Sequence, residues 1–535
     1  MPFGGAEQLN SARRHSGGCL MEKLPWWNDA QKALADEVER FADEITLRAQ
    51  ELVWRRKYPV EIIKEAGKRG WLGTIIPEEY GGSPETGFTG SCIVLEELSR
   101  VSLAGMHCVV HLCDEYMLLK HGSEELKEEF LPKMARGDLI GALVVTEPYV
   151  GNDAAAIETV ARKEGDEYVL EGKKRFISGV GVSDVYFVLA RTSDEPEAVR
   201  RHEHLSMFVV ERGAEGFHVE RVNELMGFDN IYNAYLDLDG VRVPADRMIG
   251  EEGEGWRVLM TMANYERLLA SAVPLGMMRE ALRYAIFHMS RRIQFGQPTL
   301  ALPTNQFKVA DMLMRYHAAR LMTYHAAYLF DLGKEPIIEV AAARCFNADL
   351  AFRVFEDATQ CMGGDGVTKF YPVEAFVRNG KIGQLAPTTT DIMKLVVFRF
   401  GLRAWAAALR PPRRKIHDEL KVPVTVGYYG AAATAEKEKA EGRSITEDDV
   451  LNALAENYKV NPGLYMHRND LKEELGVGDD KLDELLTSLE SKGLATLYRR
   501  KGRIELARAT FKGLKAAKVE EYRWFPEWVD TEYMF

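Results

Sequence analysis

The spacing of apolar residues changes twice along this chain, and this change constrains the fold more than any other feature. Residues 25–139 show the apolar spacing of helices. Residues 140–250 switch to alternation, as in 184–190 and 205–210, with turns rich in Gly, Pro and charge between the runs. From 251 to 411 the helical spacing returns. The chain is therefore predicted to insert a β-domain between two helical domains.

A separate unit is predicted after residue 411. Pro411 and Pro412 end the helical pattern, and 412–443 has the composition of a linker. Residues 444–519 predict three helices followed by a two-stranded hairpin, with expected spans of 446–458, 468–475, 479–492 and 496–506. That order resembles a winged helix-turn-helix module.

Both ends of the chain are predicted to lie outside the folded domains. Residues 1–24 are expected to be disordered, with Met21 as an alternative start. Residues 520–535 form an aromatic tail. Such a tail more often docks onto its own protein than binds a ligand.

Composition argues against several classes of function. At 535 residues the chain is long enough for about two to four domains. The formal net charge of -12 disfavours a general nucleic-acid binder, and no run approaches the roughly 20 apolar residues of a membrane span. The six cysteines lack the spacing of a zinc site, so no metal is expected. Scattered cysteines in a large chain fit a reducing cytoplasm.

Five motifs occur in the same order as in a known family. They are Thr146 to Pro148, Lys174 to Ser178, Arg292 to Gly296, Gln306 to Met312 and Gln360 to Gly366. Together they resemble the flavin-binding segments of the acyl-CoA dehydrogenase family, over residues 25 to 410. The resemblance implies an α+β fold with an N-terminal helical domain, a middle β-barrel-like domain and a C-terminal four-helix bundle. The winged-helix-like domain would be an addition.

The same resemblance implies a reaction. Members of that family remove two hydrogens from an acyl-CoA thioester, a carboxylate taking the α-proton while hydride leaves the β-carbon for N5 of FAD. Electrons then pass to an electron-transfer flavoprotein. Because the family's FAD also reaches a neighbouring subunit, a homodimer or homotetramer is expected.

The resemblance assigns cofactor-binding residues in two groups. Within one subunit the expected contacts are Val145 and Thr146 at the pyrimidine edge, Asn152 near the pyrophosphate, Phe176 against the ring, Ser178 near N5, and Thr389. The expected contacts to the FAD of a neighbouring subunit are Arg292, Phe295, Gln306, Gln360, Gly363 and Gly364. Arginine supplies a fork for phosphate oxygens, and glycine lets backbone N–H groups approach closely.

The loop that carries the base in many relatives departs from the family pattern. An ungapped match places Ala386 at the family's Tyr, Pro387 at its catalytic Glu and Thr388 at its Gly. A second family solution, in the isovaleryl-CoA branch, puts the base on a helix within an E-R-L sequence. Glu266, followed by Arg267, occupies that position and is the candidate base. The alternative is a helix carboxylate that pairs with Arg267 or is solvated.

Pro387 also lacks a hydrogen-bond donor that the family has at this position. In the family the backbone N–H at this position hydrogen-bonds the thioester carbonyl, and proline has no N–H. Either the N–H of Thr388 takes over or the substrate sits differently. Ala386 would also enlarge the pocket, so a branched or cyclic acyl group is expected, with Arg267, Ala386, Pro387 and Thr388 at the substrate.

One further cluster lies upstream. His107 and His111 are four residues apart on a predicted helix, and Asp114 follows them. By its place in the family this helix passes near the acyl group. One of the three could serve as an accessory acid or base for a proton remote from the thioester, as in a ring. The alternative is that none of them has a role.

Two other functions stay open. One is a DNA-associated flavoprotein like the alkylation-response branch, and the other is a flavin monooxygenase. The third helix of the C-terminal module would have to enter the DNA groove, and it is acidic, with Asp479, Asp480, Asp483, Glu484 and Glu490. The hairpin is basic at Arg499 to Lys501 and Arg503. Nucleic-acid binding is therefore disfavoured, and protein interaction or self-association is expected.

Overall fold

The computed structural model describes residues 23–404, 444–460 and 465–517, which belong to two compact units divided between residues 405 and 406. The predicted start, linker and tail at 1–22, 412–443 and 520–535 lie outside the described residues. The larger unit already includes Lys23 and Leu24, which were expected to be disordered. Lys23 pairs with Asp36 at 2.5 Å, and Leu24 is buried.

The N-terminal domain is helical, as predicted. Its helices are α2 (Asp29–Trp54), α3 (Val60–Lys68), α4 (Gly87–Val101), α5 (Ala104–His121) and α6 (Glu124–Ala135). Asn28 and Gln31 form a capping box that fixes the start of α2. α4 is buried on nearly all sides, because α2, α8 and α9 pack around it.

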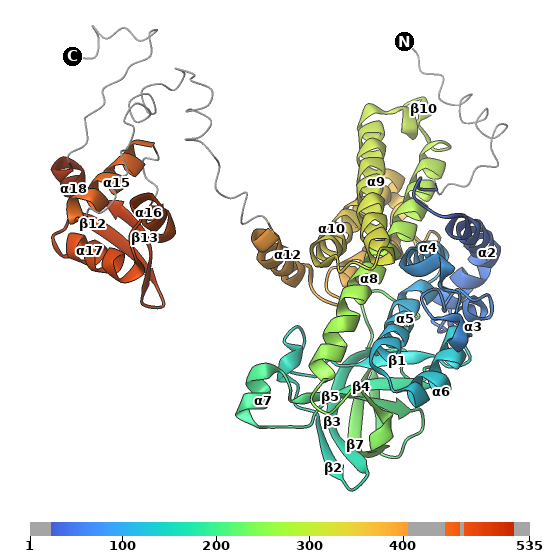
Figure 1. The fold of residues 1–535 in the computed structure, drawn as a ribbon. Helices are drawn as coiled ribbons and strands as arrows, with labels where there is room; N and C mark the ends of the chain where they lie inside the picture. Colours follow the sequence, from blue (N-terminus) through green and yellow to red (C-terminus); the bar gives the residue numbers. More distant parts are fainter. Residues whose placement is uncertain (1–22, 405–443, 461–464, 518–535) are drawn as a thin grey trace. The chain divides into compact units, whose positions relative to one another are not determined.

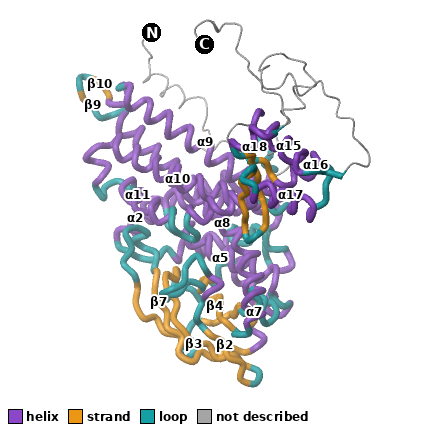
Figure 2. Tube along the Cα trace, turned by 90° about the vertical axis from the view of Figure 1, so that its left-hand side faces the viewer, coloured by secondary structure: helices purple, strands orange, loops and turns teal. Residues whose placement is uncertain are grey.

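The middle domain is a sheet of eight strands. They are β1 (Gly141–Val144), β2 (Val160–Glu164), β3 (Glu167–Ser178), β4 (Val185–Arg191), β5 (Leu205–Glu211), β6 (Phe217–Val222), β7 (Asn233–Pro244) and β8 (Met248–Ile249). The order is β6-β7-β3-β2-β4-β5-β8, and β1 pairs with β4 in parallel. A short helix, α7 (Pro196–Arg201), joins β4 to β5. Figure 2 shows this sheet at one end of the larger unit and the helices at the other.

The third domain consists of long helices. They are α8 (Gly255–Met289), α9 (Pro303–Asp331), α10 (Ile337–Met362), α11 (Val373–Gly383) and α12 (Thr390–Ala404), with a hairpin of β9 (Ile293–Gln294) and β10 (Gln297–Pro298). α8, α9 and α10 pack side by side, and α11 and α12 pack on α10. None of the described helices has an apolar stretch long enough to cross a membrane.

The smaller unit has its own apolar core. Its elements are α15 (Glu447–Val460), β11 (Met466–His467), α16 (Arg468–Leu475), α17 (Asp479–Ser491), β12 (Ala495–Arg500), β13 (Arg503–Ala509) and α18 (Phe511–Ala516), with sheet order β11-β13-β12. The three predicted helices and the hairpin are present, whereas β11 and α18 were not predicted. Much of the acidic charge on α17 is paired inside the unit, as between Arg468 and Asp483 at 2.7 Å and between Arg499 and Glu490 at 2.6 Å.

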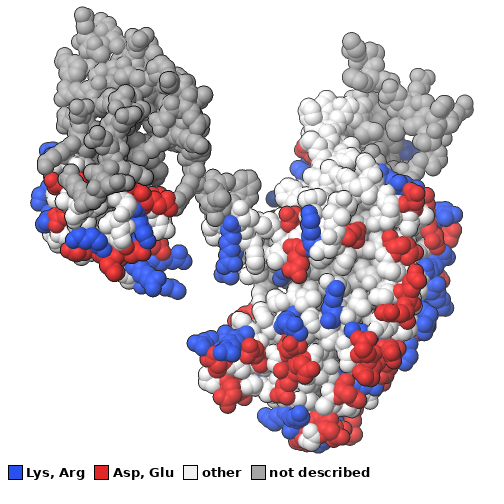
Figure 3. Space-filling view, in the orientation of Figure 1, with Lys and Arg blue, Asp and Glu red and all other residues white. Residues whose placement is uncertain are grey.

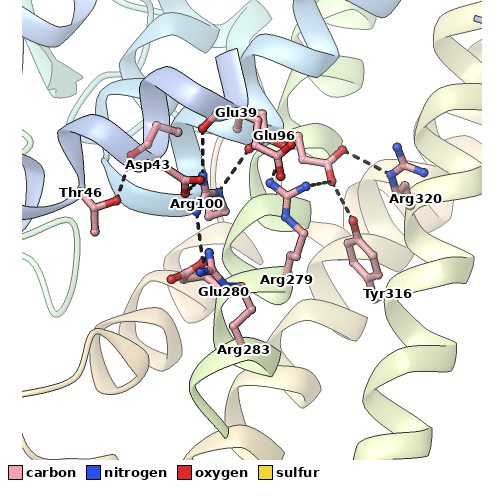
Figure 4. Close-up of polar contacts among 12 residues, drawn as sticks. Glu39, Asp43, Thr46, Glu96, Arg100, Arg279, Glu280, Arg283, Tyr316 and Arg320 are labelled. Atoms are coloured by element: carbon pink, nitrogen blue, oxygen red, sulfur yellow. Dashed lines mark hydrogen bonds and ion pairs between the residues drawn. The ribbon is translucent and has the colours of Figure 1, made fainter. Parts of the chain in front are cut away.

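A buried ionic network joins four helices of the larger unit (Figure 4). Arg279 of α8 contacts Glu96 and Glu97 of α4, and all three side chains are buried. Tyr316 of α9 donates to Glu96 at 2.9 Å, and Arg320 lies 3.6 Å from the same carboxylate. Each charge therefore has an opposite charge beside it, which buried charges require.

The network continues towards α2. The buried guanidinium of Arg100 pairs with Asp43 of α2 at 2.7 Å, with Glu97 at 3.2 Å and with Glu280 of α8 at 3.6 Å. Because these partners come from α2, α4 and α8, a shift of any one helix along its axis would leave a charge unpaired in the core. The network thus fixes the register of α8 against the N-terminal domain.

We expect Arg279→Met to lower the free energy of unfolding of the larger unit by about 3–5 kcal/mol, because it leaves two buried carboxylates with one guanidinium fewer, Glu97 keeping Arg100 and Glu96 keeping Arg320. The matched control is Arg283→Met, one turn further along α8. Its guanidinium is 42% exposed, so the change should cost less than about 1 kcal/mol. Chemical denaturation checks both. Equal effects of the two changes would show that the network does not stabilise the fold.

Candidate active site

A break in β3 presents an aromatic ring to solvent. The pairing of β3 with β7 shifts between Lys174 and Ile177, and Phe176 within this bulge has φ of +58°. The left-handed conformation turns the ring outwards, leaving Phe176 47% exposed. Arg175 lies over the ring at 4.2 Å and donates its backbone N–H to Thr146 at 2.7 Å. A flat apolar surface is thus held beside the Val145–Thr146 backbone.

A buried ion pair holds that backbone in place. The ammonium of Lys174 has no solvent exposure and donates to Glu147 at 2.8 Å, to the Leu189 carbonyl at 2.7 Å and to the Val145 carbonyl at 3.1 Å. Burial lowers the pKa of Lys174 to about 8, with Glu147 opposing the shift. Glu147 also accepts from the backbone N–H of Glu158 at 2.6 Å.

The other expected contacts within one subunit lie at the same place. Asn233 of β7 donates to Ser178 at 3.2 Å, which fixes the serine at the end of β3. Asn152 donates to Thr389 at 3.4 Å, so the loop before α12 meets the loop after β1. The structure therefore gathers Val145, Thr146, Asn152, Phe176, Ser178 and Thr389 at one edge of the sheet.

The six residues expected to serve a neighbouring subunit lie elsewhere. Arg292 and Phe295 are in the β9–β10 hairpin, Gln306 begins α9, and Gln360, Gly363 and Gly364 end α10; all six are exposed. Gln360 lies 16 residues beyond Arg344 on α10, a helix rise of about 24 Å. Among the contacts of the described residues, none joins these six to the group at Phe176.

The end of α10 nevertheless has the shape of a binding cradle. Gly363 has φ of +60° and ψ of -137°, a conformation that only glycine adopts without strain. A Cβ at Gly363 or Gly364 would meet no atom within 4 Å, so the backbone borders open space. The N–H of Gly363 itself donates to the Gln360 carbonyl, so what the turn offers is an open surface that lets a ligand approach the backbone closely.

Glu266 lies near the middle of α8 and is partly buried. Burial raises its pKa to about 7, while the charges of Arg267 and Arg344 oppose the shift. Among the described residues, Glu266 has no hydrogen bond or ion pair. A carboxylate without a partner and with a pKa near neutrality is suited to act as a general base.

The three candidate residues on α5, which are His107, His111 and Asp114, are all buried but have different surroundings. Gly141 donates its N–H to Nδ1 of His111 at 3.2 Å, so Nε2 carries the proton and faces the Met134 carbonyl at 3.1 Å. Nδ1 of His107 contacts the Tyr58 hydroxyl, and burial lowers the His107 pKa to about 3. His111 is thus held at both ring nitrogens, whereas His107 is held at Nδ1 and its buried Nε2 has no partner.

Asp114 differs from the histidines. Neither of its carboxyl oxygens has a hydrogen-bond partner, although both are buried. Burial raises its pKa well above the usual value, and the nearby charge of Glu266 raises it further. Two carboxyl groups without a hydrogen-bond partner, Asp114 from α5 and Glu266 from α8, are therefore close enough for their charges to interact.

The sequence reasoning missed Arg344 of α10. Its buried guanidinium donates to the Gly383 carbonyl at 2.6 Å and to the Ala386 carbonyl, and its Nε is buried without a partner. A small cavity of about 40 Å³ is lined by Arg344, Ala386, Ala270, Met106 and others. A lone arginine in the apolar run of residues 340–345 was the available signal, because arginine is rarely buried without a specific task.

Three family models match the larger unit in sequence order. They are the N-terminal domain of acyl-CoA dehydrogenase over residues 28–138, the middle domain over 142–241 and the C-terminal domain over 253–402. These matches confirm the predicted helical, β and helical order.

This chain aligns with nearly the full length of individual relatives. Cyclohex-1-ene-1-carbonyl-CoA dehydrogenase of Geobacter metallireducens is 36% identical over 375 residues, 69% of this chain and 97% of the relative. The solved structure of butyryl-CoA dehydrogenase from Megasphaera elsdenii is 30% identical, with a TM-score of 0.67, covering 73% of this chain and 100% of that chain. The FAD complex of PigA is 26% identical, with a TM-score of 0.67, covering 72% and 100%.

We expect Lys174→Met to lower the free energy of unfolding by about 3–5 kcal/mol, because it leaves Glu147 charged and unpaired beneath the Val145–Thr146 backbone. Lys173→Met is the matched control, since the neighbouring ammonium is 52% exposed and pairs only at the surface. Thermal denaturation and limited proteolysis of the segment around residue 148 measure the difference. Equal stability of the two variants would contradict a structural role for the buried pair.

Proposed function

The chain belongs to the acyl-CoA dehydrogenase family, and we propose that it uses FAD to oxidise the CoA thioester of a branched or cyclic acid. The observation that carries this proposal is the pair Glu266 and Pro387. The loop that would supply a base in many relatives has proline there, whereas Glu266 is an unpaired carboxylate with a pKa near 7. A thioester α-proton needs such a group nearby.

The residues of the larger unit fit a flavin. The exposed ring of Phe176 offers a flat apolar surface, and the backbone at Val145 and Thr146 lies beside it. Ser178, Asn152 and Thr389 add hydroxyl and amide groups along the same edge. FAD, when bound, supplies the acceptor for the hydride that leaves the β-carbon of the substrate. A solved relative of this chain, PigA, is an FAD complex.

Glu266 would act as the general base. Its carboxylate takes the proton from the α-carbon, and the partly buried site keeps the base from being stabilised by water. A base with a pKa of about 7 is half ionised near neutral pH. The rate of oxidation should therefore rise with pH through this value, because only the ionised form accepts the proton.

The acyl group is proposed to be cyclic, on two observations. Ala386 removes bulk from the loop, which leaves room for a ring. Asp114 provides a second unpartnered carboxyl group, close enough to Glu266 for their charges to interact. Each oxidation releases one proton and one hydride, so Glu266 would take the α-proton of a saturated thioester, and Asp114 would take a proton further away on a ring whose α-carbon carries no hydrogen. The Geobacter relative is named for a cyclohexene thioester, which agrees with this choice.

We propose self-association through the bundle. The six residues assigned to a neighbouring FAD lie exposed at one end of α8 to α10. Large apolar side chains are exposed at the same end, with Phe295 of the hairpin at 90% and Phe307 and Met314 of α9 at 72% and 61%. Figure 3 shows a largely uncharged surface over the upper bundle, in contrast to the charged N-terminal and β-domains. Apolar surface of this kind favours association.

The electron acceptor and the smaller unit complete the proposal. Family membership supports an electron-transfer flavoprotein as acceptor, and the free cysteines among the described residues agree with the proposed cytoplasmic location. For the smaller unit we propose a protein-binding role. Its α17 is acidic and would repel DNA phosphates, which speaks against a DNA-associated flavoprotein. Oxygen consumption by the reduced enzyme would instead support a monooxygenase.

We expect Glu266→Gln to bind FAD normally but to lose flavin reduction by a cyclic CoA thioester, by at least about 100-fold. Anaerobic loss of flavin absorbance measures the rate. In the unchanged protein this rate should fall as pH drops below about 7. Reduction at the original rate in the glutamine variant would remove Glu266 from the mechanism.

Asp114→Asn should separate the two proton transfers. We expect oxidation of a saturated straight-chain thioester to change little, whereas flavin reduction by cyclohexenecarbonyl-CoA falls about 100-fold or more, since the remote proton loses its acceptor. Glu115→Gln, the adjacent buried carboxyl that pairs with His111 at 3.2 Å, is the matched control. Equal losses with both substrates would assign Asp114 a structural role instead.

A further inference from the structure

The peptide between Ala386 and Pro387 poses a chemical problem for the proposed reaction. Removing the α-proton pushes negative charge onto the thioester oxygen, and that charge needs a hydrogen-bond donor. The nitrogen of Pro387 carries no hydrogen and cannot donate. In the family the flavin ribityl 2'-OH is the other donor to this oxygen, so it is the protein's own donor that must come from another part of the site.

Arg344 contacts the carbonyl group of the same Ala386–Pro387 peptide. One of its terminal nitrogens donates to the Ala386 carbonyl and also to the Gly383 carbonyl at 2.6 Å. These two bonds hold the guanidinium against the loop and use a single nitrogen. The Nε donor of the same side chain is buried and has no partner. A buried donor without a partner is costly, so its retention calls for an explanation.

The unused donor borders space on the side of the candidate base. The cavity of about 40 Å³ is lined by Arg344 and Ala386 on one side and by Ala270 on the other. Ala270 lies one helical turn beyond Glu266 on α8, on the same face. Arg344 and Glu266 are close enough for their charges to interact, yet no direct ion pair joins them. The cavity beside Arg344 therefore reaches α8 one helical turn from the candidate base.

We infer that Arg344 donates a hydrogen bond to the thioester carbonyl oxygen, in place of the backbone N–H that Pro387 lacks. This inference rests on the proposed function. Glu266 takes the α-proton, the electron pair of that C–H bond moves towards the carbonyl, and the guanidinium stabilises the charge on oxygen. Hydride leaves the β-carbon for FAD, the oxidant, and the product is the α,β-unsaturated thioester. Arg344 is then a catalytic residue that also holds the loop in place.

Arginine is suited to both tasks at once. Its planar group presents donors in several directions, so one nitrogen can hold the loop while another faces the substrate. Lysine has a single nitrogen at the end of its chain. Arg344→Lys should therefore keep a cation on the loop carbonyls; its three N–H donors all leave one nitrogen, so none lies where the Nε donor of Arg344 lies.

The test measures carbonyl polarisation without turnover. An aromatic α,β-unsaturated CoA thioester absorbs at longer wavelength when a donor polarises its carbonyl, so its spectrum on the FAD-loaded protein reports the hydrogen bond. We expect a red shift in the unchanged protein and in Glu266→Gln, and its loss in Arg344→Lys and Arg344→Met. Flavin reduction by the cyclic thioester should fall about 100- to 1000-fold in Arg344→Met.

Control variants keep the result interpretable. Arg353→Met removes an exposed guanidinium from the same helix, and it should keep both the red shift and the rate. Should Arg344→Met fail to fold, Arg344→Lys still decides the question.

Two outcomes would overturn the inference. A full red shift in Arg344→Lys would show that another donor, such as the N–H of Thr388, polarises the carbonyl; the proposed function would survive. If the unchanged protein neither shifts the spectrum nor has its flavin reduced by any CoA thioester, the proposed function fails and the inference falls with it.

Discussion

The ionic network between α4 and α8 is the constraint on which the rest of the larger unit depends. Arg279, Glu96, Glu97 and Arg100 lose their hydration on folding, and they regain that free energy only if every partner is in place. Apolar packing alone would tolerate small slides of one helix along another. Paired buried charges do not, so the network selects one register for α8.

That register has consequences at the other end of the same helix. Glu266 lies 13 residues before Arg279, about 20 Å along the axis, and its neighbours on α5 and α10 come from separate parts of the chain. Asp114 and Arg344 lie near Glu266 only because the network fixes the position of α8 along its axis. The unpaired state of Glu266 and Asp114 has a cost in stability, which the paired network elsewhere can offset. Unsatisfied carboxyl groups in an otherwise satisfied core are typical of functional sites.

The loop at Ala386 and Pro387 shows how one substitution can be compensated within a fold. The loop has neither a carboxylate nor an N–H at this position, and both kinds of group appear on the helices around it. Glu266 provides the carboxylate from α8, and Arg344 provides donors from α10. Under the proposed function, the chemistry is shared among three helices instead of being concentrated in one loop. Helices position side chains more rigidly than loops, which suits a site for a bulky acyl group.

The sequence by itself determined the order of domains and many element boundaries, because periodicity is a local property. The span of α16 matches its prediction, and the switch to alternation near residue 140 precedes β1 at Gly141. Motif order also located the residues around Thr146 and Phe176, and Glu266 as the candidate base. Only the tertiary structure distinguished Asp114 from His107 and His111, since that choice depends on which buried groups find partners. The role of Arg344 was likewise invisible, because its contacts lie about 40 residues away in the chain and exist only once α10 packs beside the loop.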